Sequence, residues 1–401
     1  MGTHKLANPV AIVGMDCTRF GEHWDRSVDD LLVEATHGAI ASTTGLTLDD
    51  VDAFWLGSMI SGVSGLTLTR PLNISHKPVT RVENMCATGS EVFRNACYAV
   101  SSGAYDVVMA VGGEKLKDAG YSGLEMPSVP NDGTAPVLSA PAMYSMIVPS
   151  YARRYGISED EVKEAMTHIA WKNHSNGALN PRAQFRKEMA KEAIAKAPTL
   201  AGRLSVFDCS GVADGAAAAV IVRAEDAHLY SDRPLYVHAL ALDAGSGTGR
   251  NDSDYDYSEL SEARVSSAAA YEQAGITDPA RQISLAEVHD CFTPTEMVLM
   301  EELGFSERGQ AWRDVLDGRY DRDGALPVNV DGGLKSFGHP IGASGLRMLY
   351  EMWLQFRGEA GERQVADPEF GLVQNQGGSP GDLVSAVTIV SGRRPEPSSQ
   401  R

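Results

Sequence analysis

Cys86 lies in a turn of small residues that favours reaction of its thiol with a carbonyl compound. The turn, Asn-Met-Cys-Ala-Thr-Gly-Ser at 84–90, follows a β-like run at 79–82 and precedes a helix expected over 91–102. At a helix start, the dipole and the free backbone N–H groups stabilise a thiolate and lower the pKa of the thiol. Small neighbours let a carbonyl oxygen approach those N–H groups. The pattern predicts a nucleophile for acyl transfer, although a single apolar cysteine is more often inert packing.

Three further motifs that can serve the same chemistry lie in the second half of the chain. They are His289-Asp290-Cys291-Phe292, the run that begins Gly338-His339-Pro340, and Gln374-Asn375-Gln376-Gly377-Gly378. We expect them at the ends of strands, where ligands bind in open α/β sheets. Thiol and imidazole groups move protons near neutral pH once their pKa values are tuned, and aligned donors stabilise an enolate or oxyanion.

The two ends of the chain carry the same order of strands and helices. The first half has strands expected at 10–13, 51–56, 106–111 and 216–222 and a helix at 27–44; the second has strands at 235–242, 284–288, 370–373 and 384–390 and helices at 260–274 and 346–356. Such alternation implies right-handed crossovers and sheets that helices cover on both faces. We expect two similar α/β halves related by a pseudo-twofold axis.

The repeat divides the chain into two halves and one insertion. We expect a first half formed by residues 1–113 with 204–232, and a second half formed by residues 233–392. Residues 114–203 have no counterpart in the second half and include a Pro-, Gly-, Ser- and Met-rich stretch at 120–149. Insertions of this kind carry ligand binding in many folds, so we expect an inserted loop domain there. The polar residues 393–401 are expected to form a disordered tail.

The overall charge and the cysteines exclude several classes of protein. The formal net charge of −18 argues against a nucleic-acid or anionic-membrane surface. No apolar run approaches the roughly 20 residues of a membrane span. Five scattered cysteines form neither a disulfide framework nor a Cys-x-x-Cys metal pair, so a reducing cytosol is the expected setting. Only residues 152–203 are basic, and they form either a surface with internal ion pairs or a docking patch for a phosphorylated ligand.

The four motifs together resemble the thiolase family over nearly the whole chain. The turn at Cys86, the run at 338–345 and Asp214-Gly215-Ala216-Ala217-Ala218 match the family closely. The His-Asp-Cys-Phe and Asn-Gln-Gly sequences look like the sterol-carrier-protein-2 type of thiolase and its archaeal and actinobacterial relatives. The resemblance implies a thiolase-like α/β fold, layered as an α-β-α-β-α sandwich, and acyl-CoA C-acyltransferase activity.

The resemblance also assigns the reacting groups. Cys86 would attack the acyl carbonyl and hold the acyl group as a thioester, while His339 would take the thiol proton. Cys291 would move a proton on or off the acetyl carbon. Asn375 and Gly378 would belong to the loop near the site. Because Asn375 stands where other thiolases have a cysteine, this second proton transfer would depend on Cys291 alone.

Two oxyanion holes follow from the same resemblance. His289 replaces the asparagine of the family's second motif and would order a water or donate directly to the oxygen. His339 would help to bind the thioester oxygen of the second substrate in that hole. The backbone N–H groups of Cys86 and Gly377 would form the other hole.

The resemblance implies an acyl-CoA substrate, a homodimer formed through the first half, and neither a metal nor a redox cofactor. The CoA moiety would lie along Glu114 to Arg203, with no single residue assigned. Some members of this subgroup are instead acyltransferases to other acceptors or retro-aldolases that need a small partner with a zinc ribbon and an OB-fold. Those aldolases have tyrosines where this chain has cysteine and histidine at the acid/base positions. A non-catalytic thiolase-fold scaffold is the remaining alternative.

Overall fold

The protein is built on one mixed sheet of nine strands. The computed structural model describes residues 5–120, 139–252 and 254–396. Across the sheet, the strands are β3 (Val79–Val82), β2 (Ala53–Gly57), β4 (Val107–Glu114), β7 (Gly215–Arg223), β1 (Val10–Cys17), β8 (Leu235–Ala244), β11 (Asp382–Ser391), β10 (Gly371–Ser379) and β9 (Leu285–Val288). Two residue pairs between β1 and β8 join the two half-sheets into one.

The strand order is symmetric about the junction of β1 and β8. On one side, β7 lies antiparallel between β1 and β4, and β2 and β3 continue in parallel. On the other side, β11 lies antiparallel between β8 and β10, and β9 continues in parallel. Val328 forms a parallel bridge to Ala286 of β9, at the place that β3 holds beside β2. The predicted α/β fold with two similar halves is confirmed.

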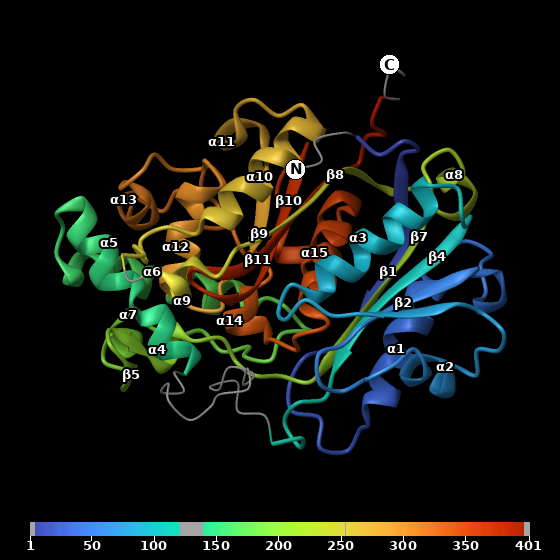
Figure 1. Ribbon diagram of the computed structural model, residues 1–401, viewed down its shortest axis with the longest axis horizontal. Helices are drawn as coiled ribbons and strands as arrows, with labels where there is room; N and C mark the ends of the chain where they lie inside the picture. The colour runs from blue at the N-terminus through green and yellow to red at the C-terminus, as the bar shows by residue number, and fades with distance from the viewer. Residues whose placement is uncertain (1–4, 121–138, 253, 397–401) are drawn as a thin grey trace.

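Helices form a central layer and two outer layers. α3 (Thr88–Ser101) and α15 (Ser344–Arg357) pack against each other and contact strands of both halves (Figure 1). α1 (Val28–Ala41) covers the outer face of the first half, and α10 (Ser261–Ala274) covers that of the second. The α-β-α-β-α layering is therefore present. The two halves also contain short helices: α2 (Leu66–Leu72), α8 (Ala227–Tyr230), α9 (Thr248–Asn251) and α11 (Pro279–Gln282).

The N-terminal turns of α3 and α15 meet at two glycines. A Cβ on Gly89 would lie 2.6 Å from the Gly345 nitrogen, and a Cβ on Gly345 would lie 2.3 Å from the Ser90 nitrogen. Neither position has room for a side chain unless the backbone moves. This contact explains the small residues after Cys86 and His339, and it places the two motifs side by side.

Local sequence accounts for several element boundaries. Ser27 and Asp30 form a capping box at the start of α1, and Gly275 ends α10 in a left-handed conformation with φ +74°. β7 is an almost continuous alanine and valine strand that is buried along its length, as expected where helices cover both faces of a sheet. None of the described helices is both long enough and apolar enough to cross a membrane.

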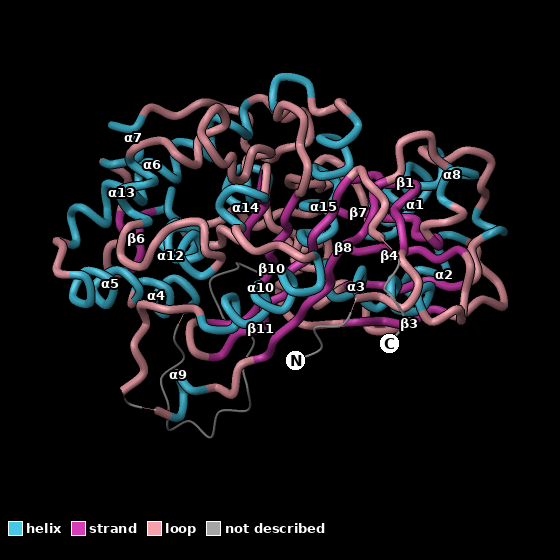
Figure 2. Tube along the Cα trace, turned by 90° about the horizontal axis from the view of Figure 1, so that it is seen from above, coloured by secondary structure: helices cyan, strands magenta, loops and turns pink. Residues whose placement is uncertain are grey.

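The part of the insertion that the structure describes is helical. It holds α4 (Ala140–Ser145), α5 (Ile147–Tyr155), α6 (Glu159–Ala178) and α7 (Lys191–Ala195), followed by a small hairpin of β5 (Thr199–Ala201) and β6 (Leu204–Ser205). These helices gather at one end of the molecule with α12 (Thr293–Glu302) and α13 (Ala311–Leu316), as Figure 2 shows. Residues 121–138 of the expected loop-rich stretch and residues 397–401 of the expected tail lie outside the described residues.

The Asp214 carboxylate bonds the start of this insertion, residues 115–117, to the first half. Its carboxylate accepts the backbone N–H groups of Leu116 at 2.7 Å and Lys117 at 2.9 Å, and it pairs with the Lys115 ammonium at 3.0 Å. Hydrogen bonds to the charged form hold the pKa of the Asp214 carboxyl below its usual value despite burial. Asp214 immediately precedes β7, so one side chain joins the segment after β4 to the strand beside it.

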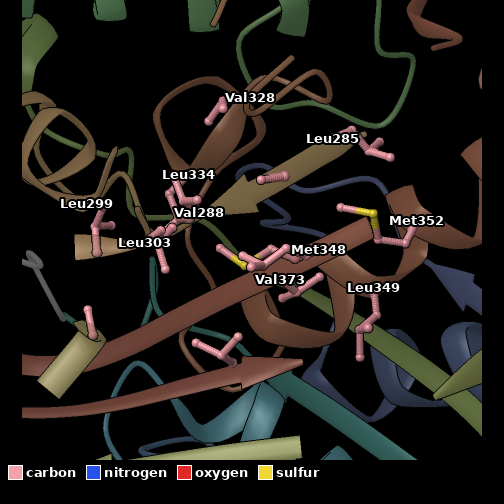
Figure 3. Close-up of a cluster of buried hydrophobic side chains, with 14 of the residues drawn as sticks. Leu285, Val288, Leu299, Leu303, Val328, Leu334, Met348, Leu349, Met352 and Val373 are labelled. Atoms are coloured by element: carbon pink, nitrogen blue, oxygen red, sulfur yellow. The ribbon is translucent and has the colours of Figure 1, made fainter. Parts of the chain in front are cut away.

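An apolar core supports the second-half motifs from below. In Figure 3, side chains from β9, α12, α14 (Gly333–Phe337), α15 and β10 converge on one cluster. The labelled members are Leu285, Val288, Leu299, Leu303, Val328, Leu334, Met348, Leu349, Met352 and Val373. Val288 directly precedes His289, and α14 ends one residue before Gly338-His339. Packing at this cluster therefore fixes the backbone that presents both histidines.

Candidate active site

Cys86 lies just outside the start of α3. The first residue of α3 is Thr88 and its capping position is Ala87, so the thiol is one residue before the cap. Thr88 holds the turn together, because its hydroxyl accepts the Asn84 N–H at 2.8 Å and donates to the Met85 carbonyl at 2.6 Å. Met85 has the left-handed φ of +51°, which is strained for a side-chain-bearing residue and is common at functional sites.

The thiol of Cys86 is less acidic than the sequence predicts. Burial, followed by the nearby carboxylates of Glu83 and Glu114, raises its pKa to about 12. The predicted lowering of this pKa by the helix start is therefore wrong. The cysteine precedes the capping position, and desolvation together with two negative charges outweighs what the N-terminus supplies. Cys86 is a neutral thiol at rest, so a base must remove its proton.

His339 is held in the tautomer that such a base requires. Its Nδ1 lies 2.7 Å from the Ser344 hydroxyl, and that hydroxyl donates its own hydrogen to the Pro340 carbonyl at 3.1 Å. Ser344 must therefore accept, which places the imidazole proton on Nδ1 and leaves the lone pair on Nε2. Nε2 has no partner among the described residues. Burial lowers the pKa of His339 to about 3, so the ring is neutral.

His289 is held in the opposite tautomer. Its Nδ1 lies 3.0 Å from the Asn375 amide nitrogen, which can only donate. Nδ1 therefore carries the lone pair, and Nε2 carries the hydrogen. Burial, with a smaller contribution from His339, holds the pKa of His289 well below its usual value, so this ring is also neutral. One histidine thus offers an acceptor and the other offers a donor.

The structure brings both histidines to the thiol. The Cys86 sulfur and one ring nitrogen each of His289 and His339 all lie within 4.8 Å of one another. The two rings meet edge to face with centroids 5.3 Å apart. These are also ligand types that Zn²⁺ accepts, so assays of this site require a chelator control. A substrate carbonyl placed at Cys86 would face a proton acceptor and a hydrogen-bond donor together.

Gly377 lies directly against the backbone of Cys86. A Cβ on Gly377 would lie 2.7 Å from the Cys86 nitrogen and 2.8 Å from the Asn84 carbonyl oxygen. No side chain fits there, so only glycine lets β10 approach the nucleophile turn so closely. This approach is the geometry that the predicted oxyanion hole of the Cys86 and Gly377 N–H groups requires.

Cys291 is buried next to the same site. It is 7% exposed, and its sulfur lies 3.9 Å from the Thr295 hydroxyl. Burial, followed by the proximity of Cys86, raises the pKa of Cys291 above its ordinary value, so it also rests as a neutral thiol. Asn375 is fully buried, and Gly378 follows with φ +101°. The structure therefore gathers the residues that the four motifs predicted, while their catalytic roles stay predictions.

Asp290 is a supporting residue to which the sequence assigned no role. Its carboxylate accepts the N–H groups of Leu334 at 2.6 Å and Lys335 at 3.2 Å, and the Asn173 amide at 2.8 Å. It thus caps α14, which leads into His339, from a position between His289 and Cys291. Nothing in the sequence pattern marks this link, because it joins residues more than forty positions apart through backbone N–H groups.

Two further histidines lie away from the site. His168 and His174 are both buried within α6. His168 lies between Asp321 at 2.9 Å and Lys191 at 3.1 Å, which makes it part of a structural network. Cys17 and Cys97 are fully buried packing residues.

The chain matches two family models and several known proteins along nearly its whole length. The thiolase N-terminal domain model matches residues 10–225, and the thiolase C-terminal domain-like model matches residues 246–393. The acetyl-CoA acetyltransferase of Methanothermobacter thermautotrophicus is 36% identical over 397 residues, which cover 95% of this chain and 99% of that protein. Sterol carrier protein 2 of Bos taurus is 29% identical over 93% of this chain and 70% of its own length.

The solved structures agree on the fold. A chain of the Ltp2-ChsH2(DUF35) aldolase superposes with a TM-score of 0.81 at 24% identity, covering 97% of this chain and all of that chain. The protein therefore belongs to the thiolase family, as the four motifs predicted. Within that family it is an acyltransferase, and its relatives at 34–36% identity are acetyl-CoA acetyltransferases. Its activity is acyl-CoA C-acyl transfer of the thiolase type.

Proposed function

We propose that the reaction runs through an acyl-enzyme on Cys86. The observation that carries this proposal is the pair of neutral histidines beside one thiol, with an acceptor nitrogen on His339 and a donor nitrogen on His289. This arrangement supplies a base for the nucleophile and a donor for an oxyanion without a metal. Metal and redox cofactors have no role in the proposed steps.

In the cleavage direction, Cys86 attacks the C3 carbonyl of a 3-ketoacyl-CoA. As the C–S bond forms, the thiol proton passes to His339 Nε2, and the Cys86 and Gly377 N–H groups receive the developing oxyanion. The C2–C3 bond then breaks. The electron pair leaves as the enolate of acetyl-CoA, whose oxygen accepts from His289 Nε2–H and whose carbon takes the Cys291 proton. A neutral thiol at Cys291 suits this step, because the proton is present when the enolate departs.

The second half-reaction releases the acyl group. The sulfur of free CoA gives its proton to solvent and attacks the Cys86 thioester, while the Cys291 thiolate regains its proton from solvent. The protonated His339 returns its proton to the Cys86 sulfur as that C–S bond breaks. Acyl-CoA leaves, and every catalytic group is restored. Condensation follows the same steps in reverse, so the ratio of substrates decides the direction.

The test of the acyl-enzyme is its direct detection. Incubation with acetyl-CoA or acetoacetyl-CoA should add one acetyl group to the protein in intact-mass measurements, and peptide mapping should place that group on Cys86. Added CoA should remove it. Absence of an adduct with every acyl-CoA tried, in chelated and untreated protein alike, would favour the non-catalytic scaffold.

The tautomer of His289 gives a prediction for Asn375. Asn375→Asp replaces the donor at His289 Nδ1 with an acceptor, so the ring hydrogen moves to Nδ1 and Nε2 loses its donor function. We expect kcat for acetoacetyl-CoA thiolysis to fall by roughly 10²-fold or more, the cost of one oxyanion-hole donor. Asn375→Ala, which leaves both tautomers accessible, should lose less. Equal activity of Asn375→Asp and the parent protein would contradict the assigned tautomer.

We propose that the CoA phosphates bind at Arg186 and Lys187. Both side chains are exposed, and neither forms an ion pair within the described part of the chain. Several other cations of this basic segment are already paired, Lys172 with Glu296 at 2.7 Å for example. The backbone beside Arg186 and Lys187 contacts α14, which leads into His339. The Phe185 N–H donates to the Ser336 carbonyl at 2.9 Å, and the Ser336 hydroxyl donates to the Phe185 carbonyl at 2.6 Å. Arg186 and Lys187 therefore lie near the approach to His339.

Removing both cations should weaken substrate binding without changing the chemical step. For Arg186→Ala/Lys187→Ala, we expect KM for acetoacetyl-CoA to rise about tenfold, with kcat within about twofold. A truncated pantetheine thioester, which lacks the nucleotide, should react equally with both proteins. Arg153→Ala, at an exposed arginine of α5, is the matched control. An unchanged KM would place the phosphates elsewhere on the insertion.

We propose a homodimer that pairs through β3. This strand is at one edge of the sheet with Thr80 exposed, whereas β9 at the other edge is fully buried. An exposed edge offers free N–H and C=O groups to another strand. Exposed apolar side chains of Ile60, Val63 and Leu66 follow β2 in the same half. Light scattering should give twice the 42.9 kDa chain mass, and a monomer would contradict this pairing.

A second candidate is a thiolase-fold acyltransferase or retro-aldolase that works with a partner subunit. The observation that favours it is the similarity to the chain named in the Ltp2-ChsH2(DUF35) aldolase. Cys291 and His339 favour Claisen chemistry instead. Turnover of acetoacetyl-CoA by the purified chain alone would support the thiolase reaction, whereas activity that appears only with an added OB-fold and zinc-ribbon protein would support the second candidate.

A further inference from the structure

Tyr144 of the insertion projects into the catalytic centre. It lies on α4, which Ser139 caps, and it is 3% exposed. Its ring packs against Phe292, the neighbour of Cys291, with centroids 4.6 Å apart and an interplanar angle of 30°. Its hydroxyl donates to the Gly378 carbonyl at 3.0 Å. The side chain thus joins α4 to two of the four catalytic motifs.

The same hydroxyl lies near the sulfur proposed to move the substrate proton. It is close enough to the Cys291 thiol that the charge of either Cys291 or Cys86 would act on it. Tyr144 therefore lies at the side of Cys291 where a charge appears and disappears during the reaction.

A phenol suits both protonation states of that sulfur. While Cys291 is a thiol, the phenol hydrogen goes to Gly378, and the phenol oxygen is free to accept the S–H. Once Cys291 is a thiolate, the same O–H can turn and donate to it. Burial raises the pKa of Tyr144 above its ordinary value, so the phenol keeps its hydrogen throughout. Phenylalanine at this position would supply neither contact.

We propose that Tyr144 is a positioning residue that orients the Cys291 sulfur and stabilises its thiolate, so that the insertion completes the acid/base site. This inference rests on the proposed role of Cys291. It also gives the insertion a second task besides CoA binding. The sequence offered no signal for it, because Tyr144 lies within a Pro-, Gly-, Ser- and Met-rich stretch with no recognisable motif.

The test compares Tyr144→Phe with Tyr151→Phe. Tyr151 is an equally buried tyrosine of the same insertion whose hydroxyl donates to Glu301, so its change controls for the loss of a buried phenol. Two rates are measured over a range of pH: acetylation of Cys86 by acetyl-CoA, and exchange of the acetyl C–H hydrogens of acetyl-CoA with D₂O. Thermal unfolding checks that both variants fold.

For Tyr144→Phe, we expect exchange to slow by about tenfold or more, the loss that follows removal of one hydrogen bond to a charged group. The pH midpoint of exchange should move upward, because the thiolate loses a donor. Cys86 acetylation should stay within about threefold, and Tyr151→Phe should change neither rate. Exchange by Tyr144→Phe at the parent rate and pH midpoint would overturn the inference.

Different measurements test the Cys86 acyl-enzyme and the role of Tyr144. If the parent protein forms no adduct at Cys86, the acyl-enzyme itself is wrong. If the parent acylates and exchanges, and Tyr144→Phe does both equally well, only the role of Tyr144 is wrong. A variant that loses acetylation and exchange together, while folding normally, would also overturn it, because a partner of Cys291 should spare the first step.

Discussion

Replacing Cys86 with alanine should eliminate the acyl adduct and lower kcat for acetoacetyl-CoA thiolysis by at least about 10⁴-fold, the scale seen when a covalent nucleophile is removed. The structure gives the reason: His339 and His289 converge on this one sulfur, and the Gly377 backbone lies against the backbone nitrogen of the same residue. None of the other four cysteines combines partial exposure with both histidines. Intact-mass measurement and a coupled thiolysis assay check the two parts. An adduct of undiminished yield in Cys86→Ala would move the nucleophile elsewhere.

The pH dependence of acylation separates this mechanism from a resting thiolate–imidazolium pair. The pKa of His339 is lowered to about 3 and that of Cys86 is raised to about 12, so base and thiol are both neutral between those values. His339 loses its base function only as the pH falls toward its lowered pKa. Acylation by acetyl-CoA should therefore be nearly flat from about pH 5 to pH 8. A midpoint near the ordinary histidine value would show a pre-formed ion pair instead.

Much of the fold could be read from the sequence because its signals are local. Alternating apolar runs, the cap at Ser27 and the glycines that end helices each act within a few residues. The duplication then limited how these elements could be arranged. The site motifs were equally accessible, since cysteine and histidine in turns after strands are rare enough to stand out.

The remaining features depend on contacts between distant segments. The raised pKa of Cys86 comes mainly from burial of its thiol, with smaller contributions from Glu83 and from Glu114 of β4, and no local pattern predicts this burial or connects β4 to the nucleophile turn. The tautomer of His289 depends on Asn375, which is 86 positions away. Tyr144 packs against Phe292, the neighbour of Cys291, only because the insertion folds back over the second half. Such contacts follow from packing rather than from residue type, which explains why the sequence predicted the reacting groups and not their states.

Cys291→Ala should separate the two half-reactions. Its thiol lies beside Cys86, yet the proposed mechanism uses it only for the proton on the acetyl carbon. We expect acetylation of Cys86 within about threefold of the parent rate, while exchange of the acetyl C–H hydrogens and C–C cleavage fall by roughly 10³-fold, within the range for loss of a general acid or base.

Cys97→Ala is the matched control for Cys291→Ala, because Cys97 is a fully buried packing thiol on α3 that lacks any of the predicted roles. It should leave both rates unchanged. The contrast with Cys86→Ala is the decisive feature: Cys86→Ala blocks the first step, whereas Cys291→Ala forms the acyl-enzyme and stops there. Exchange at the parent rate in Cys291→Ala would assign the carbon proton to another group, and His339 would then be the base to test, since its Nε2 has no partner among the described residues.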